Sequence, residues 1–442
     1  MSDNAFEPAG IAVPHRRIAR LARMGSLASG VAGGMAWSGA RGLLRGERPN
    51  RRDLLLTPEN AARITRELAR MRGAAMKVGQ LLSMESREML PPELADILAH
   101  LRNDAHFMPP AQLKRVLSAQ WGADFMTRFS RFDVRPLAAA SIGQVHRAIT
   151  RDGRDLAIKV QYPGVRASID SDVDNVATLV RLSGLLPEGI DLAPLLDEAK
   201  TELHLEADYT REGRALSRAH DLFDSVPGLR VPRLHADLTT PDILAMDHVD
   251  AVPIETLDTA PQDLRDRVAG RLLRLVFDEI FVHGVMQTDP NFANFRYAPD
   301  TGDVVLLDFG ATRDIAPETA AAYARILRAG RAGDRGALHA AALSAGFYTA
   351  DAPADYVATI LDMMQIALAP LFDRAPFDFA ATDLADRMRD RGMALAHRRD
   401  YVHVPPMDTL LIQRKVGGMF LLAARLAARV PLAPLLDAAV PR

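Results

Sequence analysis

The sequence contains no cysteine, which excludes disulfides, thiolate metal sites and cysteine nucleophiles. It also lacks a basic excess, because 54 lysines and arginines face 56 aspartates and glutamates, for a formal net charge of −2. A general nucleic-acid binder would carry a basic stripe, so no nucleic-acid partner is expected. We find no internal repeat and no low-complexity linker. The 442 residues, 48% hydrophobic and 25% charged, are enough for a two-lobed globular domain with extensions.

Lysine is scarce. Arginine accounts for 54 − 5 = 49 of the basic residues, and the five lysines are Lys77, Lys114, Lys159, Lys200 and Lys415. Arginine presents a planar fork, whereas lysine presents a compact ammonium ion. A lysine kept inside a motif of such a chain therefore hints that the compact cation is needed there.

A convincing membrane-spanning run is also missing. Residues 24–44 follow a basic stretch and are rich in small residues, but their glycines and serines make them only weakly apolar. Two interpretations stay open. The segment docks on an anionic membrane or a partner helix, or it is an N-terminal helix packed on its own domain.

Hydrophobic periodicity divides the chain into four parts with α+β character. Residues 1–50 are the basic, small-residue segment, and residues 51–128 are expected to be helical with one buried face. Residues 129–250 should hold a small antiparallel sheet with a hairpin turn at Asp152-Gly153, a long helix over 192–220, and a second strand pair at 230–234 and 243–246. Residues 251–442 should be helical apart from the stretch 289–308.

Asp289, Asn294 and Asp308 form the most informative pattern. The amide follows the first acid by five positions, and the second acid lies in Leu306-Leu307-Asp308-Phe309-Gly310. Protein-kinase-type folds use this order to orient a phosphoryl acceptor and to hold magnesium. Magnesium takes a few protein oxygens and completes its octahedron with nucleotide phosphates and water. The pattern predicts ATP and Mg²⁺ as cofactors, Asp289 as the base or orienting group, and Asn294 and Asp308 as metal ligands.

A loop rich in alanine lies at the position of the kinase glycine-rich loop, ahead of Lys159 in Leu156-Ala157-Ile158-Lys159. We assign it to nucleotide binding with Lys159, the phosphate-contacting residue. The loop comprises Ala138, Ala139, Ala140, Ser141, Ile142, Gly143, Gln144 and Val145. With only Gly143 left, the loop should be stiffer than its kinase counterpart. Taken alone, the three alanines would also fit a tight turn chosen for packing.

Acidic residues on the predicted long helix are candidates to hold Lys159. Glu202 and Glu206 are four apart and would share a helix face, and Asp208 follows them. We expect Glu202 or Glu206 to pair with Lys159, leaving the other acids to bind another cation or the magnesium, although a solvated acidic face is the alternative. Met246 and His248, at the end of a predicted strand, are added to the nucleotide site.

Two features of ordinary protein kinases are missing. No His-Arg pair precedes Asp289, so control through a phosphorylated activation loop is not expected. After Gly310 only about six residues pass before Pro317-Glu318 begins a helix, with proline and an acid in its first turn. Little chain is left to bind a peptide substrate.

Lys77-Val78-Gly79-Gln80 lies in the helical N-terminal region, with Lys77 and Gln80 on one helix face. With this motif and those above in order, the chain resembles the UbiB family of atypical kinase-like proteins, also called aarF-domain kinases. Gln-Thr-Asp-Pro-Asn at 287–291 and Asp-Phe-Gly-Ala-Thr-Arg at 308–313 resemble the coenzyme-Q-linked branch. The resemblance runs from about residue 13 to residue 313.

The resemblance implies that the Lys77, Gly79 and Gln80 segment folds over the active site as a gate, with Lys77 contacting acidic groups there. It implies an alanine loop that tempers autophosphorylation and favours ATPase behaviour. It also implies a role in ubiquinone biosynthesis at a membrane, with a lipid, a ubiquinone-precursor-like ligand or the biosynthetic enzymes as partners. A homodimer is also considered. One departure is Gly213 after Glu212, where the family usually has alanine.

Three functions are compatible with these observations. The first is a Mg-ATP-dependent ATPase or small-molecule kinase supporting ubiquinone biosynthesis in the bacterial cytoplasm, peripheral to the inner membrane. The second is a nucleotide-binding pseudokinase scaffold, which would not need both metal ligands and Asp289. The third is a protein kinase, which the short segment after Gly310 disfavours.

Overall fold

The computed structural model describes residues 71, 73–75, 77–78, 107–182, 193–396, 398, 401 and 403–440. Chain contacts divide it into two compact units, Met1–Arg214 with Leu234–His248, and Ala215–Arg233 with Val249–Arg442. We describe each unit by itself. The predictions for residues 1–50, for most of the helical extension up to residue 106, and for Gly79 and Gln80 lie outside the described residues. The four-part division of the chain stays a prediction.

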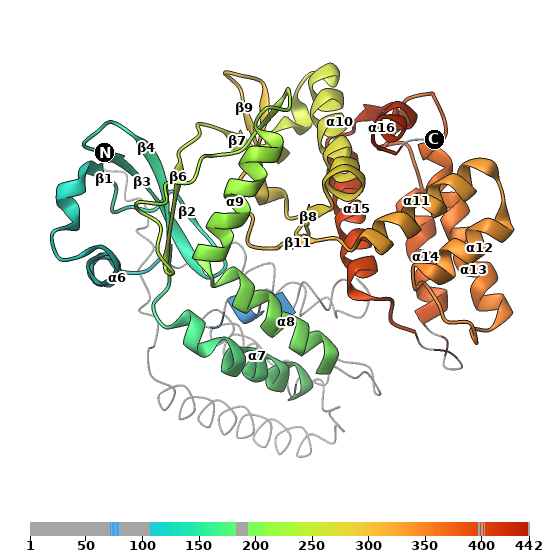
Figure 1. Ribbon diagram of the computed structural model, residues 1–442, viewed down its shortest axis with the longest axis horizontal. Helices are drawn as coiled ribbons and strands as arrows, with labels where there is room; N and C mark the ends of the chain where they lie inside the picture. The colour runs from blue at the N-terminus through green and yellow to red at the C-terminus, as the bar shows by residue number, and fades with distance from the viewer. Residues whose placement is uncertain are drawn as a thin grey trace, which may run out of the picture. The chain divides into compact units, whose positions relative to one another are not determined.

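The first unit contains an antiparallel sheet of five strands (Figure 1). They are β1 (Phe129–Phe132), β2 (Ala138–Ala139), β3 (Gly143–Thr150), β4 (Asp155–Gln161) and β6 (Ile243–Asp247). The order is β1-β3-β4-β6, and β2 also pairs with β3. The β3–β4 hairpin turns at Gly153, whose φ of 89° is rarely adopted by other residues. The predicted small sheet and its hairpin are confirmed.

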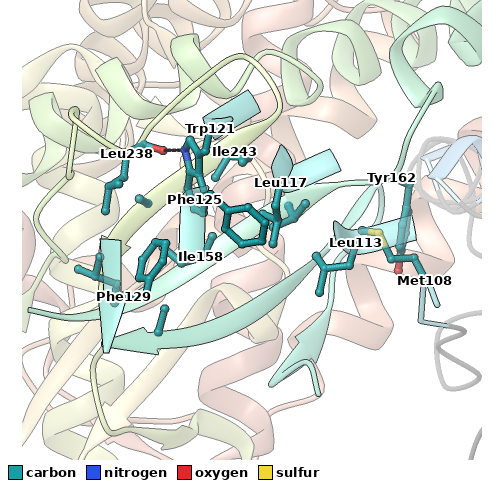
Figure 2. Packing of buried hydrophobic residues seen from close by; sticks show 14 residues of the cluster. Met108, Leu113, Leu117, Trp121, Phe125, Phe129, Ile158, Tyr162, Leu238 and Ile243 are labelled. Atoms are coloured by element: carbon teal, nitrogen blue, oxygen red, sulfur yellow. Dashed lines mark hydrogen bonds between the residues drawn. The ribbon is translucent and has the colours of Figure 1, made fainter. Parts of the chain in front are cut away.

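Helix α6 (Pro110–Trp121) packs its apolar side against this sheet, as Figure 2 shows. Trp121 lies at the centre of an aromatic group, with its ring centroid 5.4 Å from that of Phe129. Its indole N–H donates to the carbonyl of Leu238 at 3.0 Å, so the polar end of the ring is satisfied inside the core. Leu117 is buried beside it with 1% exposure. This core fixes the sheet that carries Lys159.

The predicted helix over 192–220 is two helices, α8 (Ala193–Glu206) and α9 (Tyr209–Phe223), which follow α7 (Val165–Leu182). The break occurs because the Ala207 carbonyl accepts from the side chains of Gln161 and Arg166. The Asp208 carboxylate accepts from the N–H of Arg211 at 3.1 Å, which is the arrangement of a helix N-cap. The prediction of one continuous helix is wrong.

The predicted strand at 243–246 is confirmed as β6, but the strand at 230–234 is reduced to the two residues of β5 (Leu229–Arg230), and the two strands do not pair with each other. β6 pairs along its length with β4, and only an isolated bridge joins Leu234 to Met246. β5 instead pairs in parallel with β10 (Asp303–Leu306) in the second unit. Two-residue strands leave too little periodicity to identify their partners.

The second unit is mainly helical (Figure 1). Its main helices are α10 (Gln262–Asp278), α11 (Pro317–Ala332), α12 (Arg335–Ser344), α13 (Ala354–Leu368), α14 (Leu384–Ala396), α15 (Met407–Arg425) and α16 (Leu432–Ala439). The helix start at Pro317 is as predicted. Helix α10 buries Val268, Leu272 and Val276, which follow one another by four positions and so lie on one face of the helix.

Short strands extend beyond the predicted stretch 289–308, so the expectation of helix everywhere else in this unit is wrong. One sheet has the order β5-β10-β9-β7, with β7 at Val252–Pro253 and β9 at Phe295–Ala298. β8 (Val285–Gln287) pairs with β11 (Thr312–Asp314), and β12 (Phe377–Asp378) pairs with β13 (Arg429–Val430). The β8–β11 and β9–β10 pairs frame the segment that carries Asp289, Asn294 and Asp308.

Leu117→Ala should lower the free energy of unfolding of the first unit by about 2–5 kcal/mol, because the core beside Trp121 can close only partly over the lost volume. The measurement is urea unfolding followed by Trp121 fluorescence in a Trp37→Phe background, which leaves one tryptophan. Leu137→Ala, at a side chain 52% exposed, is the control and should change stability by less than about 0.5 kcal/mol. Equal effects of the two substitutions would show that this core does not support the sheet.

Candidate active site

The second unit brings Asn294 and Asp308 together through the β9–β10 hairpin. Phe295 pairs with Leu306 at the end of the ladder, and the N–H of Leu307 donates to the carbonyl of Asn294 at 3.0 Å. Asn294 and Asp308 therefore come from adjacent backbone positions, although fourteen residues separate them in sequence. Both line the same small cavity. The two predicted metal ligands share one site.

Asp289 belongs to the same cluster. The Asn294 amide nitrogen lies 3.2 Å from the Asp289 carbonyl oxygen and 3.2 Å from Asp289 Oδ2, and donates to both. The loop is held further by Thr288, whose N–H and hydroxyl both donate to the Ala311 carbonyl. Asn294 thus contacts Asp289 and lines a cavity with Asp308, so the three residues on which the prediction of nucleotide chemistry rests lie in one cluster of one unit.

The donor set fits a magnesium ion. Because the Asn294 amide nitrogen faces Asp289, its oxygen is the atom that would face a cation. The Asp308 carboxylate is oriented by the N–H of Gly310, which donates to Oδ1 at 2.9 Å. One carboxylate and one amide oxygen are what magnesium takes from a protein when nucleotide phosphates supply other ligands. The metal role of these two residues stays a prediction.

Helix α15 adds a cation to this cluster that the sequence analysis missed. Arg414 Nη2 lies 3.0 Å from Asp289 Oδ1, and its side chain is only 7% exposed. The two oxygens of Asp289 therefore have different donors, Arg414 on Oδ1 and Asn294 on Oδ2. More than a hundred residues separate Arg414 from Asp289, and no local pattern links them.

A buried lysine–glutamate pair lies behind the same loop. Lys415 is fully buried, and its ammonium donates to the Gln287 carbonyl at 2.7 Å and lies 3.2 Å from Glu279 Oε2. The other Glu279 oxygen accepts from the Gln287 N–H at 3.1 Å. Glu279 begins a π-helical turn, Glu279–His283, a form that often marks functional sites. Burial raises the pKa of the Glu279 carboxyl, and the positive charge of Lys415 opposes that rise.

Lys159, in the first unit, does not pair with Glu202 or Glu206, so that prediction is wrong. Its ammonium lies 2.8 and 3.0 Å from the two oxygens of Glu212, and 5.0 Å from the centroid of the Tyr209 ring. Because the chain breaks before Asp208, α9 starts a new helix with its own buried face. Glu212, 1% exposed, is on that face. A single continuous helix would have put it on a different side from the two earlier acids, which explains why it was missed.

Glu202 and Glu206 instead hold Lys77. The Lys77 ammonium lies 2.8 Å from Glu202 Oε2 and also contacts Glu206 Oε1, and Lys77 is only 3% exposed. The Ser141 hydroxyl donates to Glu206 at 3.2 Å, which links these acids to the alanine loop. The contact of Lys77 with acidic groups is the one that the family resemblance implied, whereas its gating role stays a prediction.

The alanine loop forms a tight turn between β2 and β3. The N–H of Ala140 donates to the Gly143 carbonyl at 2.8 Å. A Cβ on Gly143 would lie 2.5 Å from the Val160 carbonyl oxygen, so only glycine fits there. Gln144 is fully buried, and its Oε1 accepts from the Met108 N–H. The Gln144 side chain therefore stabilises the core, and Ile142 is buried as well.

The remaining predicted nucleotide-site residues have structural roles in the first unit. Asp208 caps α9, and Met246 pairs with Ala157 on β4. The N–H of His248 donates to the Asp155 carbonyl, four residues before Lys159 on the same strand. Their contacts with nucleotide stay predictions. Gly213, where the family usually has alanine, is closely packed, and a Cβ there would lie 3.2 Å from a methyl of Leu234.

Comparisons with known proteins find a matching family model and similar curated proteins. The model of the ABC1 atypical kinase-like domain matches residues 100–341. Atypical kinase COQ8, mitochondrial, of Saccharomyces cerevisiae is 38% identical over 431 residues, or 96% of this chain and 84% of that protein. Atypical kinase COQ8B, mitochondrial, of Rattus norvegicus is 35% identical over 420 residues, or 95% of this chain and 79% of that protein.

A solved structure has a similar fold. Rv3197 of Mycobacterium tuberculosis, in its complex with erythromycin, matches with a TM-score of 0.61 at 26% identity, over 87% of this chain and 96% of that chain. The predicted two-lobed, protein-kinase-like α+β fold and the predicted family resemblance are confirmed.

The predicted location in the bacterial cytoplasm, peripheral to the inner membrane, is wrong. The two curated relatives are named as mitochondrial proteins of eukaryotes. Residues 24–44, the segment considered for membrane docking, lie outside the described residues. Over the part of the chain that the structure describes, no helix combines the length and the apolar character needed to cross a bilayer.

Glu212→Gln should weaken Mg-ATP binding about tenfold, which corresponds to about 1.4 kcal/mol, because Lys159 loses the carboxylate that orients its ammonium. The measurement is the dissociation constant of Mg-ATP by isothermal titration calorimetry. Glu318→Gln, at an exposed residue of the first turn of α11, is the control and should have no effect. A larger loss of Mg-ATP affinity for Glu202→Gln than for Glu212→Gln would support a pairing of Lys159 with Glu202 and contradict its pairing with Glu212.

Lys415→Met should lower the free energy of unfolding by about 3–5 kcal/mol at pH 7, because it leaves the Glu279 carboxylate buried without its cation. The pKa of Glu279 in the folded state lies above its ordinary value of 4.5. Stability from this group is therefore fully present below the unfolded pKa and is lost as pH rises through the folded pKa. Guanidinium unfolding of the variant should show a smaller loss at pH 5 than at pH 7.

The control for this experiment is Lys114→Met, at an exposed lysine of α6, and it should leave stability unchanged at both pH values. The double variant Lys415→Met, Glu279→Leu should recover stability, because it removes both buried charges. A loss for Lys415→Met that does not depend on pH would show that Glu279 does not carry the effect.

Proposed function

This chain belongs to the ABC1 atypical kinase-like family, and we propose that it is a Mg-ATP-dependent ATPase or small-molecule kinase that supports ubiquinone biosynthesis. The observation that carries the proposal is the cluster of Asp289, Asn294 and Asp308 within one unit. Two of its side chains have the oxygens that magnesium prefers. The third is a carboxylate held in one orientation by two donors.

Each residue has a role set by its contacts. Lys159, held by Glu212, contacts the phosphate oxygens of ATP as a compact cation. Asn294 and Asp308 hold the magnesium ion, which neutralises charge on the phosphates when it is bound. Asp289 orients the attacking hydroxyl or water and accepts its proton. Lys77, held by Glu202 and Glu206, belongs to the segment that gates access.

The acceptor is proposed to be a small molecule or water. Between β11, which ends at Asp314, and α11, which begins at Pro317, only two residues intervene. The equivalent part of a protein kinase is the activation segment on which a peptide lies. So short a connection supports a lipid, a ubiquinone-precursor-like ligand, or ATP hydrolysis coupled to the ubiquinone biosynthetic enzymes.

A pseudokinase scaffold is the alternative. The buried Lys159–Glu212 pair would serve nucleotide binding alone equally well, and that observation favours a scaffold as much as an enzyme. The contacts that orient Asp289 favour the enzyme, because a nucleotide-dependent scaffold needs no oriented carboxylate at that position.

Asp308→Asn should lower Mg-ATP-dependent phosphate release by about a hundredfold or more, because it removes the charge that holds the metal. Release is measured on the purified full chain, with and without liposomes. Asp300→Asn, at an exposed position in the turn between β9 and β10 of the same hairpin, is the matched control and should behave as wild type. If wild type and Asp308→Asn release phosphate equally slowly, the proposed enzymatic function is excluded and the pseudokinase scaffold is favoured.

A further inference from the structure

We propose that helix α15 positions the catalytic loop, with Arg414 as the positioning residue for Asp289 and Gly418 as the contact that seats the loop. The inference deepens the proposed function and rests on it. Figure 1 shows α15 beside the β8–β11 pair that frames the loop. Three residues within little more than one turn of this helix reach the segment 287–290.

Arg414 fixes the orientation of the Asp289 carboxylate. Its Nη2 lies 3.0 Å from Oδ1, and Asn294 Nδ2 lies 3.2 Å from Oδ2. Rotation of the carboxylate about its side-chain bonds would break both contacts at once. The pair is largely removed from solvent, at 7% and 17% side-chain exposure, so it is screened less than a surface ion pair. Asp289 is therefore held from both sides.

Gly418 lets the helix approach the loop closely. It follows Arg414 by four positions and so lies on the same face of α15. A Cβ at this position would lie 2.3 Å from Pro290 Cβ and 2.5 Å from Pro290 Cγ, distances that real Cβ atoms do not show. Any side chain here would push Pro290, the residue after Asp289, away from the helix. The adjacent Gly417 is exposed, and a Cβ there would meet nothing within 4 Å.

Lys415 anchors the start of the same loop. Its ammonium donates to the Gln287 carbonyl at 2.7 Å, two residues before Asp289. The helix therefore contacts three residues of the loop. It contacts the backbone carbonyl of Gln287, the side-chain carboxylate of Asp289 and the ring of Pro290. These contacts act at different atoms, and together they determine where the Asp289 carboxylate lies.

Positioning of this kind affects turnover more than nucleotide affinity. A displacement of about 1 Å at a reacting group costs roughly a hundredfold in rate. Arg414 acts through its contact with Asp289, which is assigned to the attacking hydroxyl or water and not to phosphate binding. We therefore expect kcat to fall in variants of this face while KM for Mg-ATP stays nearly constant. The missing arginine before Asp289, noted in the sequence, is consistent with support from α15 instead.

The first test compares two arginines of α15 in steady-state phosphate release. Arg414→Ala should lower kcat by about 10- to 100-fold with less than about a threefold change in KM. Arg425→Ala, at an exposed residue in the last turn, should keep the wild-type values. Added guanidinium ion should restore part of kcat to Arg414→Ala but none to Asp289→Asn, which a merely structural role of Arg414 would not produce.

The second test compares two adjacent glycines. Gly418→Ala should lower kcat by about tenfold or more through displacement of Pro290, whereas Gly417→Ala should leave kcat unchanged and stabilise the helix by about 0.5–1 kcal/mol. Equal kcat values for the two alanine variants would overturn the proposal. An unchanged kcat in Arg414→Ala would also overturn the proposal. An increased kcat would overturn it as well, because it would show that Arg414 inhibits Asp289.

A third measurement does not depend on activity. Amide hydrogen exchange of residues 287–294 should become faster in Arg414→Ala and Gly418→Ala than in wild type, and stay unchanged in Arg425→Ala and Gly417→Ala. If wild type and Asp308→Asn release phosphate equally, the proposed function fails while this measurement still decides whether α15 holds the loop. If turnover is confirmed and exchange does not change, the inference about α15 fails alone.

Discussion

Burying an ammonium ion without an opposite charge beside it costs several kcal/mol, and this constraint organises both units. Three of the five lysines in the chain are buried, namely Lys77 at 3%, Lys159 at 8% and Lys415 at 0% exposure. Each lies against at least one glutamate. Because removing either partner would leave a buried charge, each pair restricts how the segments that carry it can be arranged.

The consequences follow from which segments are joined. Lys159 ties β4 to α9 through Glu212, and Lys77 ties its own segment to α8 through Glu202. In the second unit, Lys415 ties α15 to the start of the catalytic loop and to Glu279. Arg414, the next residue, then reaches Asp289. Segments that are distant in sequence are thus joined by ion pairs whose residues are proposed to take part in nucleotide chemistry.

The part of the site that was predictable is the part encoded in short, ordered motifs. Asp289, Asn294 and Asp308 were recognisable because one hairpin carries the last two and one short loop carries the first. The small sheet and its turn at Gly153 were predictable from alternating residues and a glycine. The scarcity of lysine pointed to Lys77 and Lys159 because both lie in recognisable motifs, whereas Lys415 lies in none of them.

The partners of these residues were not predictable, because they come from other elements. Glu212 was missed because side-chain contacts to the Ala207 carbonyl break the helix and reset the buried face. Arg414 and Gly418 reach the loop only after α15 folds back beside it, and nothing in the local sequence specifies that packing. Two-residue strands such as β5 carry too little pattern to assign a neighbour.

The most direct test of the account is a crystal structure of the full chain with magnesium and a non-hydrolysable ATP analogue. The account predicts a magnesium ion coordinated by the amide oxygen of Asn294 and a carboxylate oxygen of Asp308, with Arg414 still paired to Asp289. Bound nucleotide with no metal ion at Asn294 and Asp308 would contradict it.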